Sequence, residues 1–173
     1  MSEIVFTPFP HDAMVEGVEA IAVAMEAEGW RPSLLVGVGR GGLTPAVFLS
    51  HRMGIQLVSI DYSTRIAQFG EELVAVLAER SRTGERLLFV EDINDSGKTI
   101  GELRTALAAE GAISSNIRFC VLLDNSRSAQ RVDYHFRRID RSITKDWFVF
   151  PWEAMAPRET IALEAVEVPE RLA

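Results

Sequence analysis

Cysteine is nearly absent from this chain, and no long hydrophobic run occurs in it. The 173 residues include one cysteine, Cys120, so an internal disulfide is excluded. Cys120 lies in the apolar run "FCVLL", which indicates a buried core residue. No apolar stretch approaches the roughly 18 residues of a membrane span, and the N-terminus lacks the basic and then apolar pattern of a signal peptide. We therefore expect a cytoplasmic protein without membrane contact.

Positive charge is also scarce. The formal net charge is −7, which argues against nucleic acid as a partner because a nucleic-acid-binding face is basic. Lys98 and Lys145 are the only lysines among 18 cationic residues. The apolar content of 47% is ordinary for a globular protein, and the length fits one domain. We expect residues 1–173 to form that single domain.

Apolar runs and helical patterns alternate along the chain. The runs that read as strands cover residues 33–39, 55–61, 86–92 and 117–124. Apolar residues at three-to-four spacing predict helices at residues 11–29, 43–54 and 98–111. Strands that are apolar almost throughout fit a parallel sheet covered on both faces. The order of strands and helices therefore predicts an α/β fold with a doubly wound, mostly parallel sheet.

The segment of residues 63–85 has two interpretations. Its centre, "EELVAVLAER", fits a helix and also fits an alternating strand of a hairpin. Polar residues flank this centre on both sides, which is typical of loops. We expect a flexible loop at about residues 62–84.

The stretch "LLFVEDINDSGKT" joins a strand to a phosphate-binding turn. Its end, "SGKT", matches the tail of a Walker A loop, but Asp92 stands where that loop needs glycine. In an open α/β sheet, ligands bind at the carboxyl ends of the strands, where this turn lies. The backbone N–H groups of the turn, the hydroxyls of Ser96 and Thr99, and the dipole of the following helix are suited to surround a phosphate.

Two carboxylates come directly before this turn. Glu91 and Asp92 end the strand, so they face whatever is attached to the bound phosphate. Carboxylates accept hydrogen bonds from the paired hydroxyls of a ribose, and they also hold Mg²⁺. The pattern therefore predicts a site for a sugar 5-phosphate. The alternative is that Asp95 and Ser96 only cap the next helix, which leaves the two earlier carboxylates unexplained.

A second glycine-rich turn follows the strand of residues 33–39. The stretch "GVGRGG" spells G-x-G-x-x-G, and Asp61 ends the next strand about twenty residues on, as in a dinucleotide-binding fingerprint. Arg40 counts against this interpretation, because its side chain would crowd the place where backbone approaches a pyrophosphate. The fingerprint also leaves the other phosphate turn without a function.

Together these motifs resemble the type I phosphoribosyltransferase family. "LLFVEDINDSGKT" is similar to the family's signature for phosphoribosyl pyrophosphate (PRPP): four apolar residues, two acidic ones and a D-[ST]-G-x-T loop. For the 5-phosphate, the resemblance implies contacts from Asp95, Ser96, Gly97, Lys98 and Thr99. For the ribose, it implies Glu91 and Asp92. The stretch "GRGGL" resembles the family's pyrophosphate loop, which implies pyrophosphate contacts from Arg40, Gly41, Gly42 and Arg65.

The stretch "KDWFVFPWE" resembles the nucleobase segment of the xanthine–guanine branch of this family. In that branch an aromatic or aliphatic side chain stacks on the purine, and backbone groups read the edge of the purine. By position, Trp147 and Phe148 are the base contacts. Phe150 and Trp152 are also compatible with a place in the core. The resemblance further implies Mg²⁺ as a cofactor, with the ligands Asp92, Glu91 and Glu153.

One position departs from the purine branch. A lysine usually follows the strand that here reads "CVLL", and it donates to the 6-oxygen of the purine. The matching residue in this chain is Asn125, which donates a hydrogen bond but carries no charge. Arg127 or Arg131 is a candidate to replace the cation, and both are equally compatible with a solvated loop. The departure affects the choice of base and leaves PRPP binding untouched.

The resemblance implies transfer of a phosphoribosyl group from PRPP to a nucleobase, expected to be a 6-oxopurine, as in purine salvage. Asp95 is the candidate catalytic residue, either to accept the proton of the base or to stabilise positive charge on the ribose. Tyr62, Ser63 and Arg65 are expected to close over the site and exclude water.

The family fold implies further features of the whole molecule. It adds a small hood, expected near the N-terminus and at residues 125–173, and it implies a homodimer or homotetramer. A different class of function also fits the motifs: a non-catalytic module that senses PRPP or nucleotides.

Overall fold

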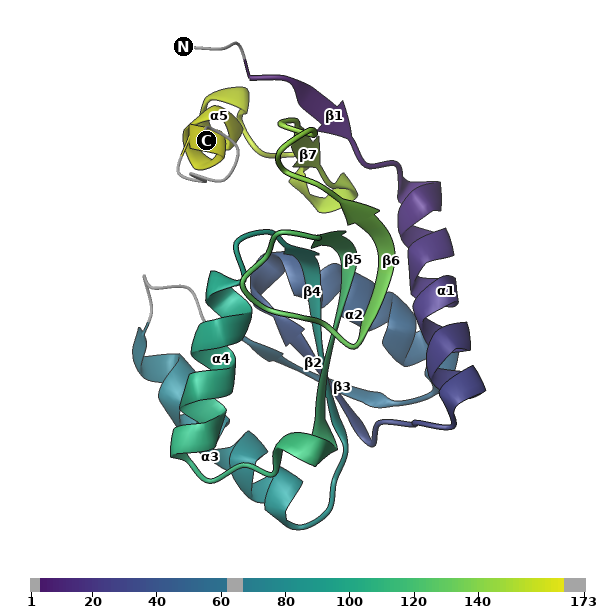
Figure 1. Ribbon diagram of the computed structural model, residues 1–173, viewed down its shortest axis with the longest axis vertical. Coiled ribbons are helices and arrows are strands. Elements are labelled where there is room, and N and C mark those ends of the chain that lie inside the picture. Colours follow the sequence, from purple (N-terminus) through teal and green to yellow (C-terminus); the bar gives the residue numbers. More distant parts are fainter. Residues whose placement is uncertain (1–3, 62–66, 167–173) are drawn as a thin grey trace.

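A five-stranded sheet forms the centre of the computed structural model, which describes residues 4–61 and 67–166 (Figure 1). All neighbouring strands of this sheet are parallel, in the order β3-β2-β4-β5-β6. The strands are β2 (Leu34–Val38), β3 (Gln56–Ile60), β4 (Leu87–Asn94), β5 (Ile117–Asn125) and β6 (Tyr134–Ile139). β4 lies in the middle of the sheet, so the motif that follows it opens at the centre of the strand ends.

Helices cover both faces of the sheet. They are α1 (His11–Glu28), α2 (Gly39–Met53), α3 (Ala67–Arg82) and α4 (Lys98–Ala109), with a short 3₁₀ helix, η1 (Ser114–Asn116), before β5. α1 and α2 share a buried cluster with Leu35 and Leu88, whereas α3 and α4 share one with Val36 and Phe89. Successive residues of a strand point to opposite faces, so each strand serves both clusters. The expected α/β fold with a mostly parallel sheet is confirmed.

The structure decides between the two interpretations of residues 63–85. Residues 67–82 form α3, so the centre of the segment is a helix and not a strand of a hairpin. The loop expected at about residues 62–84 is therefore helical over most of its length. Three residues expected to close over the site lie outside the described residues: Tyr62, Ser63 and Arg65.

α2 begins earlier than the sequence predicted. The apolar pattern places the start of this helix at Leu43, but α2 starts at Gly39, so the glycine-rich turn is its first turn. A Cβ on Gly42 would lie 2.0 Å from the carbonyl oxygen of Val90 in β4. Only glycine permits this close contact, and the contact fixes the N-terminus of α2 against the end of β4.

A smaller layer lies beyond the carboxyl ends of the main strands, at the top of Figure 1. β1 (Phe6–Pro8) pairs in parallel with β7 (Trp147–Val149), and Phe6 lies opposite Trp147. The 3₁₀ helix η2 (Pro151–Glu153) and α5 (Arg158–Val166) follow β7. We interpret this layer as the expected hood. Among the described helices, none is both long and apolar enough to cross a membrane.

Candidate active site

A pocket of about 180 Å³ opens at the carboxyl end of β4, and residues 91–100 line it. The pocket therefore gathers the whole acidic and phosphate-binding part of the motif, from Glu91 to Thr99. Its position agrees with the rule that open α/β sheets bind ligands beyond the carboxyl ends of their strands.

Gly97 gives the phosphate turn its shape. Its φ of 87° lies in the left-handed region, and it immediately precedes α4. A Cβ at this position would also lie 2.7 Å from Ser128 Oγ, so the turn has no room for a side chain. Ser96 Oγ accepts the N–H of Lys98 at 3.2 Å. The Lys98 side chain is exposed at the start of α4, where a cation can meet a phosphate bound by the helix N-terminus.

Glu91 and Asp92 form a pair of partly exposed carboxylates at the edge of the pocket. Glu91 Oε2 accepts the N–H of Asp92, and Asp92 Oδ1 accepts the N–H of Ile93, each at 2.7 Å. Burial raises the pKa of Glu91 well above its usual value, and the charge of Asp92 adds to the effect. Burial also raises the pKa of Asp92. Within the described part of the chain, neither Glu91 nor Asp92 forms an ion pair.

The first turn of α2 faces this carboxylate pair. A Cβ on Gly41 would lie 2.2 Å from Asp92 Oδ2, so a side chain there would displace the carboxylate. The first N–H groups of a helix have no partner within it and attract anions, which applies to Gly41 and Gly42. The Arg40 side chain is 94% exposed, and its Nη2 lies 3.7 Å from Glu164 Oε1. The structure thus brings Gly41 to Asp92 and Gly42 to the backbone of β4, and Arg40 lies next to them in the same turn.

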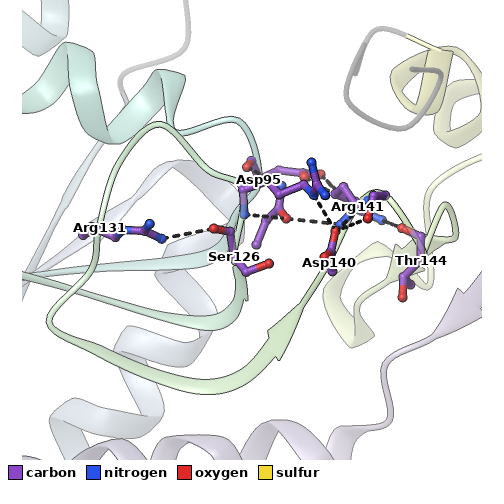
Figure 2. Close-up of polar contacts among 9 residues, drawn as sticks. Asp95, Ser126, Arg131, Asp140, Arg141 and Thr144 are labelled. Carbon is purple, nitrogen blue, oxygen red and sulfur yellow. Dashed lines mark hydrogen bonds and ion pairs between the residues drawn. The ribbon is translucent and has the colours of Figure 1, made fainter.

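Asp95 is held by Arg141, a residue that the sequence did not single out. Arg141 Nε lies 2.9 Å from Asp95 Oδ1, and Arg141 Nη2 lies 2.8 Å from Asp95 Oδ2, so the contact is bidentate (Figure 2). The side chain of Arg141 is 3% exposed and that of Asp95 is 15% exposed. Because its carboxylate is turned to Arg141, Asp95 does not cap α4. Residues 127–141 contain five arginines, and the sequence gave no reason to rank one of them above the others.

Asn125, expected at the nucleobase, supports the phosphate turn from behind. The residue is 1% exposed, and its Nδ2 donates to the carbonyl oxygen of Asp95 at 3.0 Å. Its Oδ1 accepts the N–H groups of Arg127 and Arg141, each at 3.2 Å. The oxygen and one amide hydrogen are therefore already engaged within the protein. We correct the assignment: Asn125 is a structural residue of the turn and does not present its side chain to a base.

The two arginines considered as replacements for the lysine also have partners. Arg127 Nε lies 2.9 Å from Asp140 Oδ1, and Arg131 Nη1 donates to the carbonyl oxygen of Ser126 at 3.1 Å (Figure 2). Ser126 lies in the connection between β5 and β6, and Asp140 directly follows β6. These contacts favour the interpretation of both arginines as loop residues.

The base segment divides into an outer and an inner part. Trp147 and Phe148 are half-buried on β7, and the Phe148 ring centre lies 5.4 Å from the guanidinium of Arg141. Phe150 is 4% exposed and stacks on Trp152 with ring centres 4.8 Å apart. Phe150 is therefore a core residue that Trp152 covers, which leaves the first two aromatic residues as candidates for contact with a ligand.

Glu153 does not join Glu91 and Asp92 in a preformed metal centre. In residues 4–61 and 67–166, no group of three Asp, Glu, His or Cys side chains is placed to hold an ion. Glu153 Oε2 instead accepts the N–H of Phe150 at 2.7 Å. Burial raises the pKa of Glu153, and the charge of Asp92 adds to the effect.

A buried polar network behind the pocket also escaped the sequence analysis. Asn94 Nδ2 donates to Asp124 Oδ1 at 2.8 Å, and Ser128 Oγ donates to Asn94 Oδ1 at 2.8 Å. All three side chains are buried. The network joins the end of β4 to the end of β5 and to the loop that packs on Gly97. Polar residues at the ends of two adjacent parallel strands were the available signal.

Comparison with known proteins assigns the chain to a family. The profile of the phosphoribosyl transferase domain matches residues 9–157, which is most of the chain. The protein therefore belongs to the phosphoribosyltransferase family, as the motifs indicated. The interpretation of "GVGRGG" as a dinucleotide-binding fingerprint is rejected.

Individual relatives share the family and the fold. A xanthine-guanine phosphoribosyltransferase of Cereibacter sphaeroides is 27% identical over an alignment of 143 residues, and the match covers 78% of each chain. A solved purine phosphoribosyltransferase of Pyrococcus horikoshii is 26% identical with a TM-score of 0.64, over 89% of this chain and 98% of that one. The Helicobacter pylori xanthine-guanine-hypoxanthine enzyme has a TM-score of 0.63 over 94% and 99% of the two chains. Its identity of 16% supports the fold alone.

Proposed function

We propose that this protein transfers the phosphoribosyl group of PRPP to a 6-oxopurine, with a purine nucleoside monophosphate and pyrophosphate as products. The observation that carries the proposal is the pocket of residues 91–100, in which two carboxylates with no ion-pair partner in the described part of the chain, Glu91 and Asp92, lie next to the phosphate turn. The relatives of Cereibacter sphaeroides and Pyrococcus horikoshii, at 27% and 26% identity, are both named for purines. Such a reaction belongs to purine salvage.

Each part of PRPP has a matching group in this site. The turn of residues 95–99 receives the 5-phosphate through its N–H groups, its hydroxyls and Lys98. Glu91 and Asp92 accept hydrogen bonds from the two ribose hydroxyls. Arg40 and the first N–H groups of α2 receive the pyrophosphate, because this turn meets Asp92 at Gly41 and carries an exposed cation in Arg40. Arg65 is proposed for the same anion, but it lies outside the described residues.

The carboxylate pair also fits Mg²⁺. This ion usually takes one or two carboxylates from a protein and completes its shell with substrate phosphates and water. Glu91 and Asp92 are two such carboxylates, and burial raises the pKa of both. Mg²⁺ bound here would neutralise charge that develops on the leaving pyrophosphate. Glu153 is left out of this set, since its carboxylate is engaged by the turn that contains it.

Bond breaking at C1 of the ribose leaves positive charge on the ring and negative charge on the pyrophosphate. Asp95 stands in the turn proposed to hold the 5-phosphate, and the acceptor sites of its carboxylate that Arg141 does not occupy are the proposed counter-charge to the positive ring or acceptor of the proton of the base. Arg40 stabilises the leaving anion. Trp147 and Phe148 offer the aromatic surface on which a flat base can stack.

The test is a panel of bases with PRPP and Mg²⁺, followed by pyrophosphate release and by chromatography of the nucleotide. We expect turnover with hypoxanthine, guanine or xanthine and none with uracil or orotate. The Asp92→Asn variant is the control, because it should lose PRPP affinity while its circular dichroism stays that of the parent. Tight PRPP binding without turnover of any base would favour the sensing module instead, and turnover of pyrimidines alone would refute the assignment to purines.

A further inference from the structure

Arg141 is placed where two parts of the site meet. It lies in the connection between β6 and β7, at the end of the arginine-rich stretch of residues 127–141, and its side chain is 3% exposed. Beyond its bidentate contact with Asp95, Nη1 donates to the carbonyl oxygens of Thr144 at 3.2 Å and Asp146 at 2.6 Å (Figure 2). The guanidinium therefore binds the phosphate turn on one side and the chain that leads into β7 on the other.

A buried arginine is costly unless its hydrogen bonds are well satisfied. Here the donors of Arg141 meet two carboxylate oxygens and two carbonyl oxygens, so the cost of burial is offset. The pair does not use up the carboxylate. An ionised carboxylate has about four acceptor sites, and Asp95 Oδ1 receives only the Nε contact at 2.9 Å. Arg141 thus orients Asp95 and leaves it able to meet a ligand.

A second link joins the same two segments. Asn125 donates to the carbonyl oxygen of Asp95 and accepts the N–H of Arg141, so it ties their backbones together while the ion pair ties their side chains. On its other side, the guanidinium lies 5.4 Å from the ring centre of Phe148, within the range of a cation–π contact. One side chain therefore contacts both the candidate catalytic carboxylate and the candidate base platform.

We propose that Arg141 is a positioning residue, which sets the Asp95 carboxylate and the Phe148 ring in a fixed relation to each other. This proposal rests on the proposed function, because the proposed function assigns the ribose-phosphate and base subsites that Arg141 connects. Its role is to align a base on Phe148 with the ribose held at the phosphate turn. Misplacement by about 1 Å can cost a reaction on the order of 10²-fold in rate, so the rate depends on this residue although it need not touch either substrate.

The test is a kinetic comparison of Arg141→Lys with a matched control, Arg127→Lys. Lysine keeps the charge but cannot form the bidentate contact. We expect kcat of Arg141→Lys to fall about 10- to 100-fold, whereas KM for PRPP stays within about threefold of the parent. Arg127 forms an exposed ion pair with Asp140 in the same segment, so its variant should keep kcat within about twofold. Equal kcat for both variants would overturn the proposal.

A double-mutant cycle separates positioning from general damage to the fold. In an Asp95→Asn background, Arg141→Lys should lower kcat further by less than about threefold, because residues that act as a unit have non-additive effects. Losses that multiply would show that Arg141 acts independently of Asp95. The thermal unfolding midpoint of each variant is measured in parallel, so that a kcat value is compared only between folded proteins.

A measurement that needs no turnover tests the role of Arg141 separately from the proposed function. If no base reacts, the proposed function fails, and hydrogen–deuterium exchange of the free protein then decides on Arg141. We expect Arg141→Lys to raise exchange in both the phosphate turn and β7, whereas Arg127→Lys leaves both unchanged. Increased exchange in only one of the two segments, or in neither, would show that Arg141 does not couple them.

Discussion

At the scale of single residues, the site is defined by which charges have partners. Asp95 is paired with Arg141, whereas Glu91 and Asp92 lie side by side and belong to none of the ion pairs in the described part of the chain. Unbalanced charge that is partly withdrawn from water destabilises a fold. It is therefore typical of a site whose ligand supplies the missing partner.

Glu91→Gln should stabilise the free protein and weaken ligand binding. Glutamine keeps an oxygen that can accept the N–H of Asp92 and removes one of two like charges. We expect the midpoint of thermal unfolding at pH 7.5 to rise by several degrees, since 1 kcal/mol corresponds to about 2–4 °C for a domain of this size. Calorimetric titration should show at least about tenfold weaker binding of Mg²⁺–PRPP. A variant that is both less stable and fully binding would contradict this account.

The stability gain of Glu91→Gln should depend on pH. The pKa of Glu91 in the folded protein is raised above its ordinary value of 4.5. The protonated folded form is thus favoured, and its stabilising contribution is complete below pH 4.5 and is lost as pH rises through the folded pKa. The variant should therefore match the parent near pH 4 and exceed it increasingly toward neutral pH. Urea unfolding at a series of pH values measures this difference, and a gap that is constant with pH would argue against burial of the charge.

Arg40→Ala should separate the two products. Pyrophosphate carries the charge that Arg40 is proposed to meet, whereas the phosphate of a nucleoside monophosphate is proposed to bind at the turn of residues 95–99. Loss of one charge-assisted hydrogen bond costs about 1.5–3 kcal/mol, or one to two decades in affinity. We expect product inhibition by pyrophosphate to weaken by that factor and the affinity for GMP to change less than about threefold. Similar losses for both products would assign Arg40 a structural role.

At the scale of elements, the sequence predicted the strands and helices whose apolar pattern lies within their own residues. The apolar runs and helical patterns located β2 to β5 and the helices α1, α2 and α4. β1, β6 and β7 were missed because each is short or carries polar residues, and because β1 and β7 pair with each other from opposite ends of the chain. The start of α2 was missed for a physical reason as well: two glycines disfavour a helix by propensity, but tight packing on β4 requires them there.

The candidate site was predicted to a similar degree. The phosphate turn, the carboxylate pair and the first turn of α2 are each contiguous in sequence, so pattern alone located them. Arg141 and Asn125 were not assigned correctly, because their tasks depend on a turn that lies 30 residues or more earlier in the chain. Pairing of that kind leaves no periodic signal in a single sequence.

The contact between α2 and β4 gives a test at this scale. In Gly42→Ala, the new methyl group would lie 2.0 Å from a carbonyl oxygen of β4, so α2 must shift. We expect a loss of about 1–3 kcal/mol in the free energy of unfolding, together with weaker inhibition by pyrophosphate. Gly101→Ala in α4 is the matched control, because its nearest neighbour is the end of the Gln130 side chain at 3.2 Å. That variant should change stability by less than about 1 kcal/mol, as measured by urea unfolding.

At the scale of the whole molecule, ligand binding should register as a change in global stability. A ligand that binds only the folded state at 100 times its dissociation constant adds about 2.7 kcal/mol, which corresponds to about 5–10 °C for a domain of this size. We expect this shift with GMP or IMP and a shift of less than about 2 °C with UMP at the same concentration. Differential scanning fluorimetry gives the comparison, and an equal shift with UMP would place the selectivity elsewhere than in the base.

The parallel pairing of β1 with β7 bears on the order in which the molecule can be completed during synthesis. Phe6 is opposite Trp147, so the first strand to leave the ribosome waits for a partner that is made about 140 residues later. The sheet from β2 to β5 and the pocket of residues 91–100 have all their segments by residue 125. The turn also packs on Ser128, and Arg141 holds Asp95, so the proposed sugar-phosphate subsite is complete in the growing chain at residue 141, and the proposed base platform on β7 is made after it.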